Sequence, residues 1–124
     1  MPKKILVADD EADFLKVVIA RLAKRGYEVI SAANGKEAVE LIQQHHPDLI
    51  LLDFKMPHMD GEQVCQWVKA NEQFKKIPVL FMTASTEFFA RDIMKQSLAV
   101  GYLVKPFEPN DLFERVQKLV GEPS

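Results

Sequence analysis

The sequence is poor in cysteine, in long apolar runs and in net charge, and each shortage disfavours a class of protein. One cysteine among 124 residues cannot form a disulfide within the chain, which favours a reducing compartment and hence a cytoplasmic protein. No apolar run approaches the ~20 residues of a membrane-spanning helix, and Ile5–Ala8 is too short for a signal-peptide core. The 16 basic and 18 acidic side chains give a net charge of -2. We therefore expect no direct partnership with nucleic acid or membranes driven by bulk charge.

What the sequence does contain fits one globular domain. Hydrophobic residues make up 48% of the chain and charged residues 27%. A chain of this size buries roughly two-thirds of its unfolded surface, so it can form a core without disulfides. Because no linker, repeat or low-complexity stretch divides it, we expect a single domain over residues 1–124, with no output domain visible after its last helix. The chain is then either a single-domain protein or one domain of a longer chain. The tail from Gly121 to Ser124 suits a free terminus or the start of a linker.

Five short apolar or β-rich segments alternate with stretches of helical spacing. Three of the segments are apolar at every position, which is typical of strands buried on both faces of a parallel sheet. These three are Ile5–Ala8, Leu49–Leu52 and Val79–Met82, and the two others are Glu28–Ala32 and Tyr102–Val104.

The stretches between the strands repeat apolar residues at intervals of three and four, as amphipathic helices do. Their starts or apolar faces are marked by Ala12, Asn34-Gly35, Asp60-Gly61, Phe89 with Ile93, and Asn110, which we expect to cap the last helix. The alternation predicts an α/β fold, with a doubly wound sheet of five parallel strands and five helices on its two sides.

Polar side chains follow four of the five predicted strands. Asp9-Asp10 follows the first, Asp53 the third, Thr83 the fourth and Lys105 the fifth. Each could be a helix cap, a turn residue or a surface residue when taken alone. Together they fall at the carboxyl edge of one sheet, where open α/β folds bind their ligands. Two carboxylates ~4 Å apart repel by ~4 kcal/mol, which a fold tolerates when a cation lies between them, and hard oxygen ligands favour Mg²⁺ over zinc.

The same set of residues suits phosphoryl chemistry. A carboxylate can attack phosphorus and form an acyl phosphate. The ammonium group of Lys105 can neutralise phosphoryl oxygens, and the hydroxyl group of Thr83 can donate a hydrogen bond to one of them.

These motifs resemble the receiver domain of two-component response regulators over essentially the whole chain. The matching segments are Ile5–Glu11, Asp53–Gly61, Thr83-Ala84 and Tyr102–Phe107. The resemblance implies a flavodoxin-like sheet of strand order 2-1-3-4-5. It also implies a signalling switch that catalyses only its own phosphorylation and dephosphorylation.

The resemblance further assigns roles to single residues. Asp53 would be the phosphoacceptor and would receive the group from a phosphohistidine on a sensor histidine kinase or a phosphotransfer protein. Asp10 would bind Mg²⁺ directly and Asp9 chiefly through water, and Asp53 and the backbone carbonyl of Lys55 would complete the protein ligands. Lys105 would pair first with Asp53 and then with its phosphate.

Other residues would carry the signal outward. Thr83 would move toward the phosphate and Tyr102 would turn inward behind it, changing the surface of the fourth helix, fifth strand and fifth helix. A downstream protein, not identifiable from the sequence, would read this surface, and a phosphorylation-linked homodimer is a further implied partner. The bond between Lys105 and Pro106 would be cis.

Three alternatives compete with this interpretation. A protein-interaction module of the same fold would not need phosphorylation, but the acidic and basic set is complete. An aspartate-nucleophile phosphatase would have an Asp-x-Asp motif, whereas Lys55 occupies the second position. A flavodoxin would have a phosphate-binding loop after the first strand, which this sequence lacks. His45-His46 is interpreted as a helix end, and Cys65 and Trp67 as packing residues.

Overall fold

The computed structural model describes residues 2–84 and 98–123, and within them strands and helices alternate along the chain. The strands are β1 (Lys4–Ala8), β2 (Glu28–Ala32), β3 (Leu49–Asp53), β4 (Val79–Thr83) and β5 (Gly101–Val104). The helices are α1 (Ala12–Lys24), α2 (Gly35–His45), α3 (Gly61–Ala70) and α5 (Pro109–Val120). The helix predicted around Phe89 and Ile93 lies outside the described residues.

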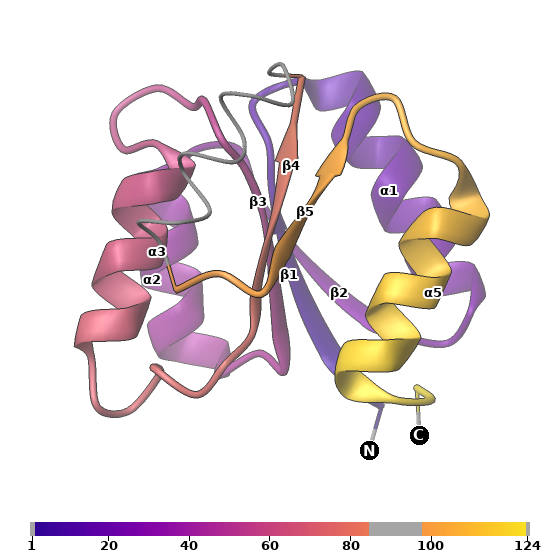
Figure 1. The fold of residues 1–124 in the computed structure, drawn as a ribbon. Coiled ribbons are helices and arrows are strands. Elements are labelled where there is room, and N and C mark those ends of the chain that lie inside the picture. The colour runs from indigo at the N-terminus through magenta and orange to yellow at the C-terminus, as the bar shows by residue number, and fades with distance from the viewer. Residues whose placement is uncertain (1, 85–97, 124) are drawn as a thin grey trace.

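The five strands form one parallel sheet in the order β2-β1-β3-β4-β5, as predicted. Helices α2 and α3 cover one face of the sheet, and α1 and α5 cover the other (Figure 1). Because β1 has β2 on one side and β3 on the other, the strand order reverses direction beside β1. The carboxyl ends of β1 and β3 therefore flank the position where such folds bind ligands.

The apolar strands form the centre of the core. Every residue of β3 and β4 is buried. Along β3, Ile50 and Leu52 pack on the side of α2 and α3, whereas Leu49 and Leu51 pack on the side of α1 and α5. Burial of one such side chain contributes roughly 1.5–3 kcal/mol, so these strands contribute much of the stability of the fold.

Polar residues at the helix starts fix where two helices begin. The side chain of Asn34 accepts a hydrogen bond from the backbone N–H of Glu37 at 2.8 Å, and Asp60 and Gln63 form a reciprocal capping box at 2.9 Å. The predicted cap at Asn110 is wrong, because α5 already begins at Pro109. A proline suits the first helical turn, where its missing N–H is no loss.

The backbone of the last connection before α5 agrees with the sequence expectation, since the bond between Lys105 and Pro106 is cis. Cys65 is buried, as expected for a packing residue, and His46 ends α2 in a left-handed conformation with its ring 5.0 Å from that of Phe74. Within the described ranges no helix has the length and apolar character needed to cross a membrane.

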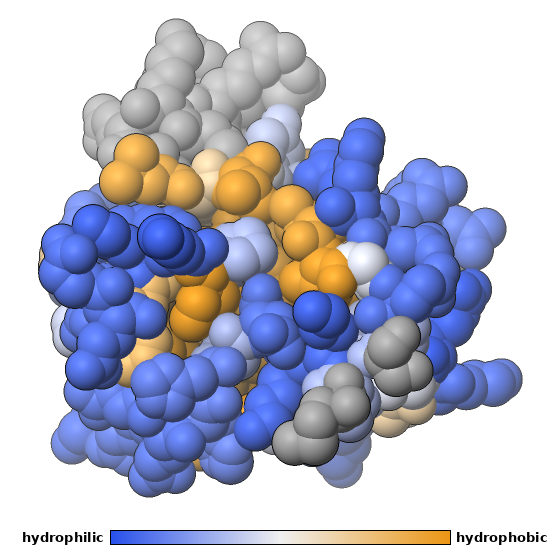
Figure 2. Space-filling view, turned by 90° about the horizontal axis from the view of Figure 1, so that it is seen from below, coloured by the Kyte–Doolittle hydropathy of each residue, from blue (hydrophilic) through white to orange (hydrophobic). Residues whose placement is uncertain are grey.

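The edge of the sheet opposite the polar residues is partly apolar. Figure 2 shows this face, below the amino ends of the strands, where apolar residues gather between two hydrophilic flanks. Leu98 and Val100, just before β5, are exposed to 70% and 51%. The charged and apolar edges of the sheet are therefore distinct.

Candidate functional site: an acidic cleft at the carboxyl edge of the sheet

The strand ends bring the predicted residues into one cleft. Asp53 ends β3 and Thr83 ends β4, while Asp9 and Asp10 directly follow β1 and Lys105 follows β5. The cleft is lined by Asp10, Glu11, Asp53, Phe54, Lys55, Thr83, Ala84 and Lys105. Asp9 lies beneath this lining and is fully buried.

Three carboxylates converge in the cleft. One oxygen from each of Asp9, Asp10 and Asp53 lies within 4.8 Å of the others. Asp9 and Asp53 are buried, and Asp10 is exposed at the mouth. Oδ2 of Asp9 is buried and accepts no aligned hydrogen bond, although Nζ of Lys105 lies 2.7 Å away. Three hard oxygen donors with one open side fit Mg²⁺, which binds through few carboxylates and keeps several waters.

The ammonium group of Lys105 holds this cluster together. Its Nζ lies 2.7 Å from Oδ2 of Asp9 and 3.4 Å from Oδ1 of Asp53, and the lysine side chain is only 8% exposed. Burial acts to lower the pKa of Lys105, but the carboxylates of Asp9, Asp53 and Glu11 outweigh it, so the pKa is raised above its usual value. Lys105 therefore stays charged at physiological pH.

Asp53 is electrostatically unlike an ordinary aspartate. Burial, followed by the negative charge of Asp9, raises its pKa from 3.8 to about 7, although the charge of Lys105 acts in the opposite direction. The folded protein therefore retains a proton on Asp53 at pH values where the unfolded chain has already released it. This difference makes the metal-free fold less stable as the pH rises from about 4 to 7, and the loss persists above pH 7.

Asp53→Asn should consequently stabilise the metal-free protein at pH 8. The amide cannot ionise, so the cost of holding a charge beside Asp9 is removed. The difference between the two pKa values sets an upper limit of about 4 kcal/mol, and we expect a gain of roughly 1–3 kcal/mol. Urea denaturation at pH 8 in the presence of a chelator measures this gain.

The same urea denaturation at pH 4 is the control. At that pH the carboxyl group in the folded protein is protonated, so the variant and the wild type should differ little. A variant that is less stable than the wild type at pH 8 would show that Asp53 is not held in an unfavourable charge environment.

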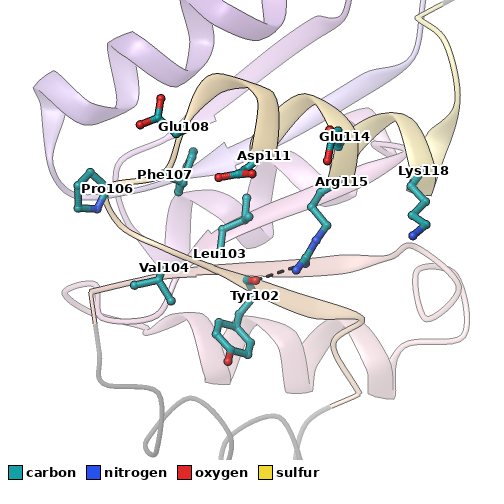
Figure 3. Close-up of a pocket in the computed structure, with 10 residues that line it drawn as sticks. All are labelled: Tyr102, Leu103, Val104, Pro106, Phe107, Glu108, Asp111, Glu114, Arg115 and Lys118. Carbon is teal, nitrogen blue, oxygen red and sulfur yellow. Dashed lines mark hydrogen bonds between the residues drawn. The ribbon is translucent and has the colours of Figure 1, made fainter.

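Thr83 and Tyr102 lie on neighbouring strands but at different surfaces. Thr83 is 4% exposed and lines the acidic cleft. Tyr102 is partly buried against the core on the side of α2 and α3, and it pairs in register with Phe81 of β4. Figure 3 shows its ring directed away from α5, while its backbone carbonyl accepts a hydrogen bond of 3.3 Å from Arg115.

Lys55 and Glu11 complete the rim of the cleft. The side chain of Lys55 is exposed, which leaves its backbone as the part suited to a ligand role. Glu11 belongs to the first sequence motif, which by itself indicates no role for this residue. In the structure its Oε1 lies 3.1 Å from Nζ of Lys105. The only sequence signal for this contact was the position of Glu11, directly after the acidic pair.

The strand order and the acidic cleft define an open α/β domain with a cluster of three carboxylates that could hold a metal ion at its topological switch point. Residues 5–117 match the model of the response regulator receiver domain, and the chain belongs to this family. It is therefore a receiver domain of two-component signalling, a class of signalling proteins and not of classical enzymes.

Comparison with curated proteins gives relatives that are longer than this chain. It is 40% identical to a probable transcriptional regulator, ycf27, of Cyanophora paradoxa over 95% of this chain and 48% of that protein. It is 37% identical to the alkaline phosphatase synthesis transcriptional regulatory protein PhoP of Bacillus subtilis, over 97% of this chain and 49% of that protein. The chain thus spans about half the length of these relatives.

Solved structures give matches over nearly full length. The chemotaxis protein CheY4 of Vibrio cholerae is 34% identical with a TM-score of 0.89, over 96% of this chain and 99% of that one. The receiver domain of the sensor histidine kinase PA1611 of Pseudomonas aeruginosa is 29% identical with a TM-score of 0.90, over 98% of this chain and 100% of that one. That structure holds a magnesium ion in its active-site cleft.

Proposed function

We propose that this chain is a Mg²⁺-dependent phosphoacceptor switch in which Asp53 receives a phosphoryl group from a phosphohistidine. The donor would be a sensor histidine kinase or a phosphotransfer protein. One observation carries the proposal: the carboxylates of Asp9, Asp10 and Asp53 converge within 4.8 Å, with the Lys105 ammonium 3.4 Å from Asp53.

Each residue of the cleft would have a separate role in phosphoryl transfer. An oxygen of Asp53 forms a bond to phosphorus as the bond between phosphorus and the imidazole nitrogen of the donor breaks. Asp9, Asp10, Asp53 and the backbone carbonyl of Lys55 would hold Mg²⁺, which when bound supplies positive charge to the phosphoryl oxygens. Lys105 would supply a second positive charge to the phosphoryl oxygens, and the Thr83 hydroxyl group would offer a hydrogen bond to one of them.

The signal would leave the cleft through β4 and β5. Thr83 and Tyr102 lie on these adjacent strands, and a shift of Thr83 toward the phosphate would bias the position of Tyr102. The surface expected to change includes β5 and α5, whose polar groove is shown in Figure 3. A downstream protein or a second copy of the chain would read it, while the chain itself catalyses only its own phosphorylation and dephosphorylation.

Metal-dependent uptake of phosphate tests this proposal. Incubation with a small acyl phosphate and Mg²⁺ should add one phosphoryl group, and a chelator or the variant Asp10→Asn should reduce the rate by about 10²-fold or more, because a charge-stabilising group is lost. Intact-protein mass spectrometry measures the uptake. The same uptake with and without Mg²⁺ would contradict the assigned metal role.

A further inference from the structure

The ammonium group of Lys105 contacts three carboxylates, and the phosphoacceptor is the most distant of them. Its Nζ lies 2.7 Å from Asp9, 3.1 Å from Glu11 and 3.4 Å from Asp53. A group that must neutralise the phosphoryl oxygens on Asp53 is therefore held partly away from Asp53 in the resting structure.

Glu11 reaches Lys105 from an unusual position. It is the N-cap residue of α1, yet its side chain makes no capping hydrogen bond. Its backbone N–H is held by Oδ1 of Asp9 at 2.8 Å, and its carboxylate extends across the cleft to a lysine 94 residues later in the sequence. The Glu11 carboxylate is thus paired with Lys105 and not with the backbone of the first turn of α1.

An aromatic side chain closes another side of the ammonium group. Nζ of Lys105 lies 4.4 Å from the centre of the Phe14 ring, which also comes from the first turn of α1. Phe14 is supported by an edge-to-face contact with Phe107, at 5.5 Å between ring centres. The cation–π contact and the Glu11 carboxylate together draw the lysine toward α1.

We propose that Glu11 is a positioning residue that holds Lys105 toward α1 before the phosphoryl group arrives, and so restrains the rate of phosphorylation. This inference rests on the proposed phosphoacceptor function of Asp53. The restraint is releasable because the side chain of Glu11 is 65% exposed, whereas that of Asp9 is fully buried. Water around the exposed Glu11 carboxylate screens its attraction for Lys105, so an incoming phosphoryl group can compete with Glu11 for the ammonium group but would not displace Asp9.

The variant Glu11→Gln tests this role against Asp13→Asn. Both substitutions remove one negative charge from the amino end of α1, but Asp13 has no ion pair with Lys105 among the described residues. At saturating Mg²⁺ and equal concentrations of a small acyl phosphate, Glu11→Gln should be phosphorylated about two- to fivefold faster than Asp13→Asn, the size expected for loss of an ion pair with one solvent-exposed partner.

A second measurement does not depend on phosphorylation. In the metal-free protein, the ¹H–¹⁵N signal of the Lys105 ammonium group should shift and exchange faster with water in Glu11→Gln, but not in Asp13→Asn. A purely structural role of Glu11 would leave this signal unchanged.

The outcomes separate the two proposals. If the wild type takes up no phosphate, the phosphoacceptor function fails. If the wild type is phosphorylated but Glu11→Gln is no faster than Asp13→Asn, or if the Lys105 signal is the same in both variants, the restraining role of Glu11 is overturned and the phosphoacceptor function stands.

Discussion

Lys105→Met should destabilise the metal-free protein at pH 8 by about 3 kcal/mol and slow phosphate uptake by about 10²-fold. The stability effect arises because Asp9 is fully buried and its Oδ2 has the Lys105 ammonium at 2.7 Å as its counter-charge. Methionine fills a similar volume but leaves two buried carboxyl groups, those of Asp9 and Asp53, without that charge. Urea denaturation in a chelator measures the first effect, and mass spectrometry over time measures the second.

Two control variants separate charge from packing. Lys105→Arg keeps the charge and should recover most of the stability, and Lys16→Met, on the exposed surface of α1, should change the unfolding free energy by less than about 0.5 kcal/mol. If Lys105→Met is as stable as Lys16→Met, then the lysine does not balance the buried carboxylates.

Gly61→Ala should destabilise the fold by roughly 2–3 kcal/mol and weaken Mg²⁺ binding at the same time. A Cβ atom at residue 61 would lie 2.3 Å from the backbone oxygen of Asp53 and 3.2 Å from Cα of Phe54. The backbone N–H of Gly61 also donates to the oxygen of Phe54 at 2.9 Å, so the start of α3 is fixed against the end of β3. A methyl group there must push the end of β3 away, because backbone atoms cannot rotate aside.

Gly101→Ala is the matched control for this prediction. A Cβ atom at residue 101 would meet the end of the Arg115 side chain at 3.0 Å and a methyl group of Leu80 at 3.4 Å, and both can move. We expect a loss below about 1 kcal/mol. Thermal unfolding compares the stability of the two variants, and calorimetric titration with Mg²⁺ measures metal binding at the acidic cleft. Equal stability of Gly61→Ala and Gly101→Ala would show that the contact between residue 61 and Asp53 does not constrain the fold.

The strands, and the meeting of the polar residues at one edge of the sheet, were predictable because both follow from local patterns in the sequence. A run such as Leu49–Leu52, apolar at every position, suits a strand with both faces buried, and the sheet places it next to β1 and β4. Since the carboxyl ends of parallel strands share one edge, residues directly after the strands, such as Asp53 and Lys105, had to approach each other.

The rest depended on features that sequence spacing does not report. The start of α5 was misplaced by two residues, since the N-cap is Glu108 and not Asn110, although Pro109 was a local signal for the first helical position. The pairing of Glu11 with Lys105 depends on how a side chain from α1 extends across the cleft, and no periodicity encodes that direction. Likewise, the raised pKa of Asp53 comes from burial and from Asp9, which only the three-dimensional arrangement places nearby.

Locating the phosphoryl group is the most direct test of the central claim. The wild type is incubated with Mg²⁺ and a small acyl phosphate, in parallel with Asp53→Asn and with Asp13→Asn as a control for charge. Mass spectrometry of the intact protein and of its peptides should show one phosphoryl group on Asp53 in the wild type and in Asp13→Asn, and none in Asp53→Asn. Uptake that persists in Asp53→Asn, or a wild type that takes up no phosphate, would contradict the account, and the latter would favour a protein-interaction module that works without phosphorylation.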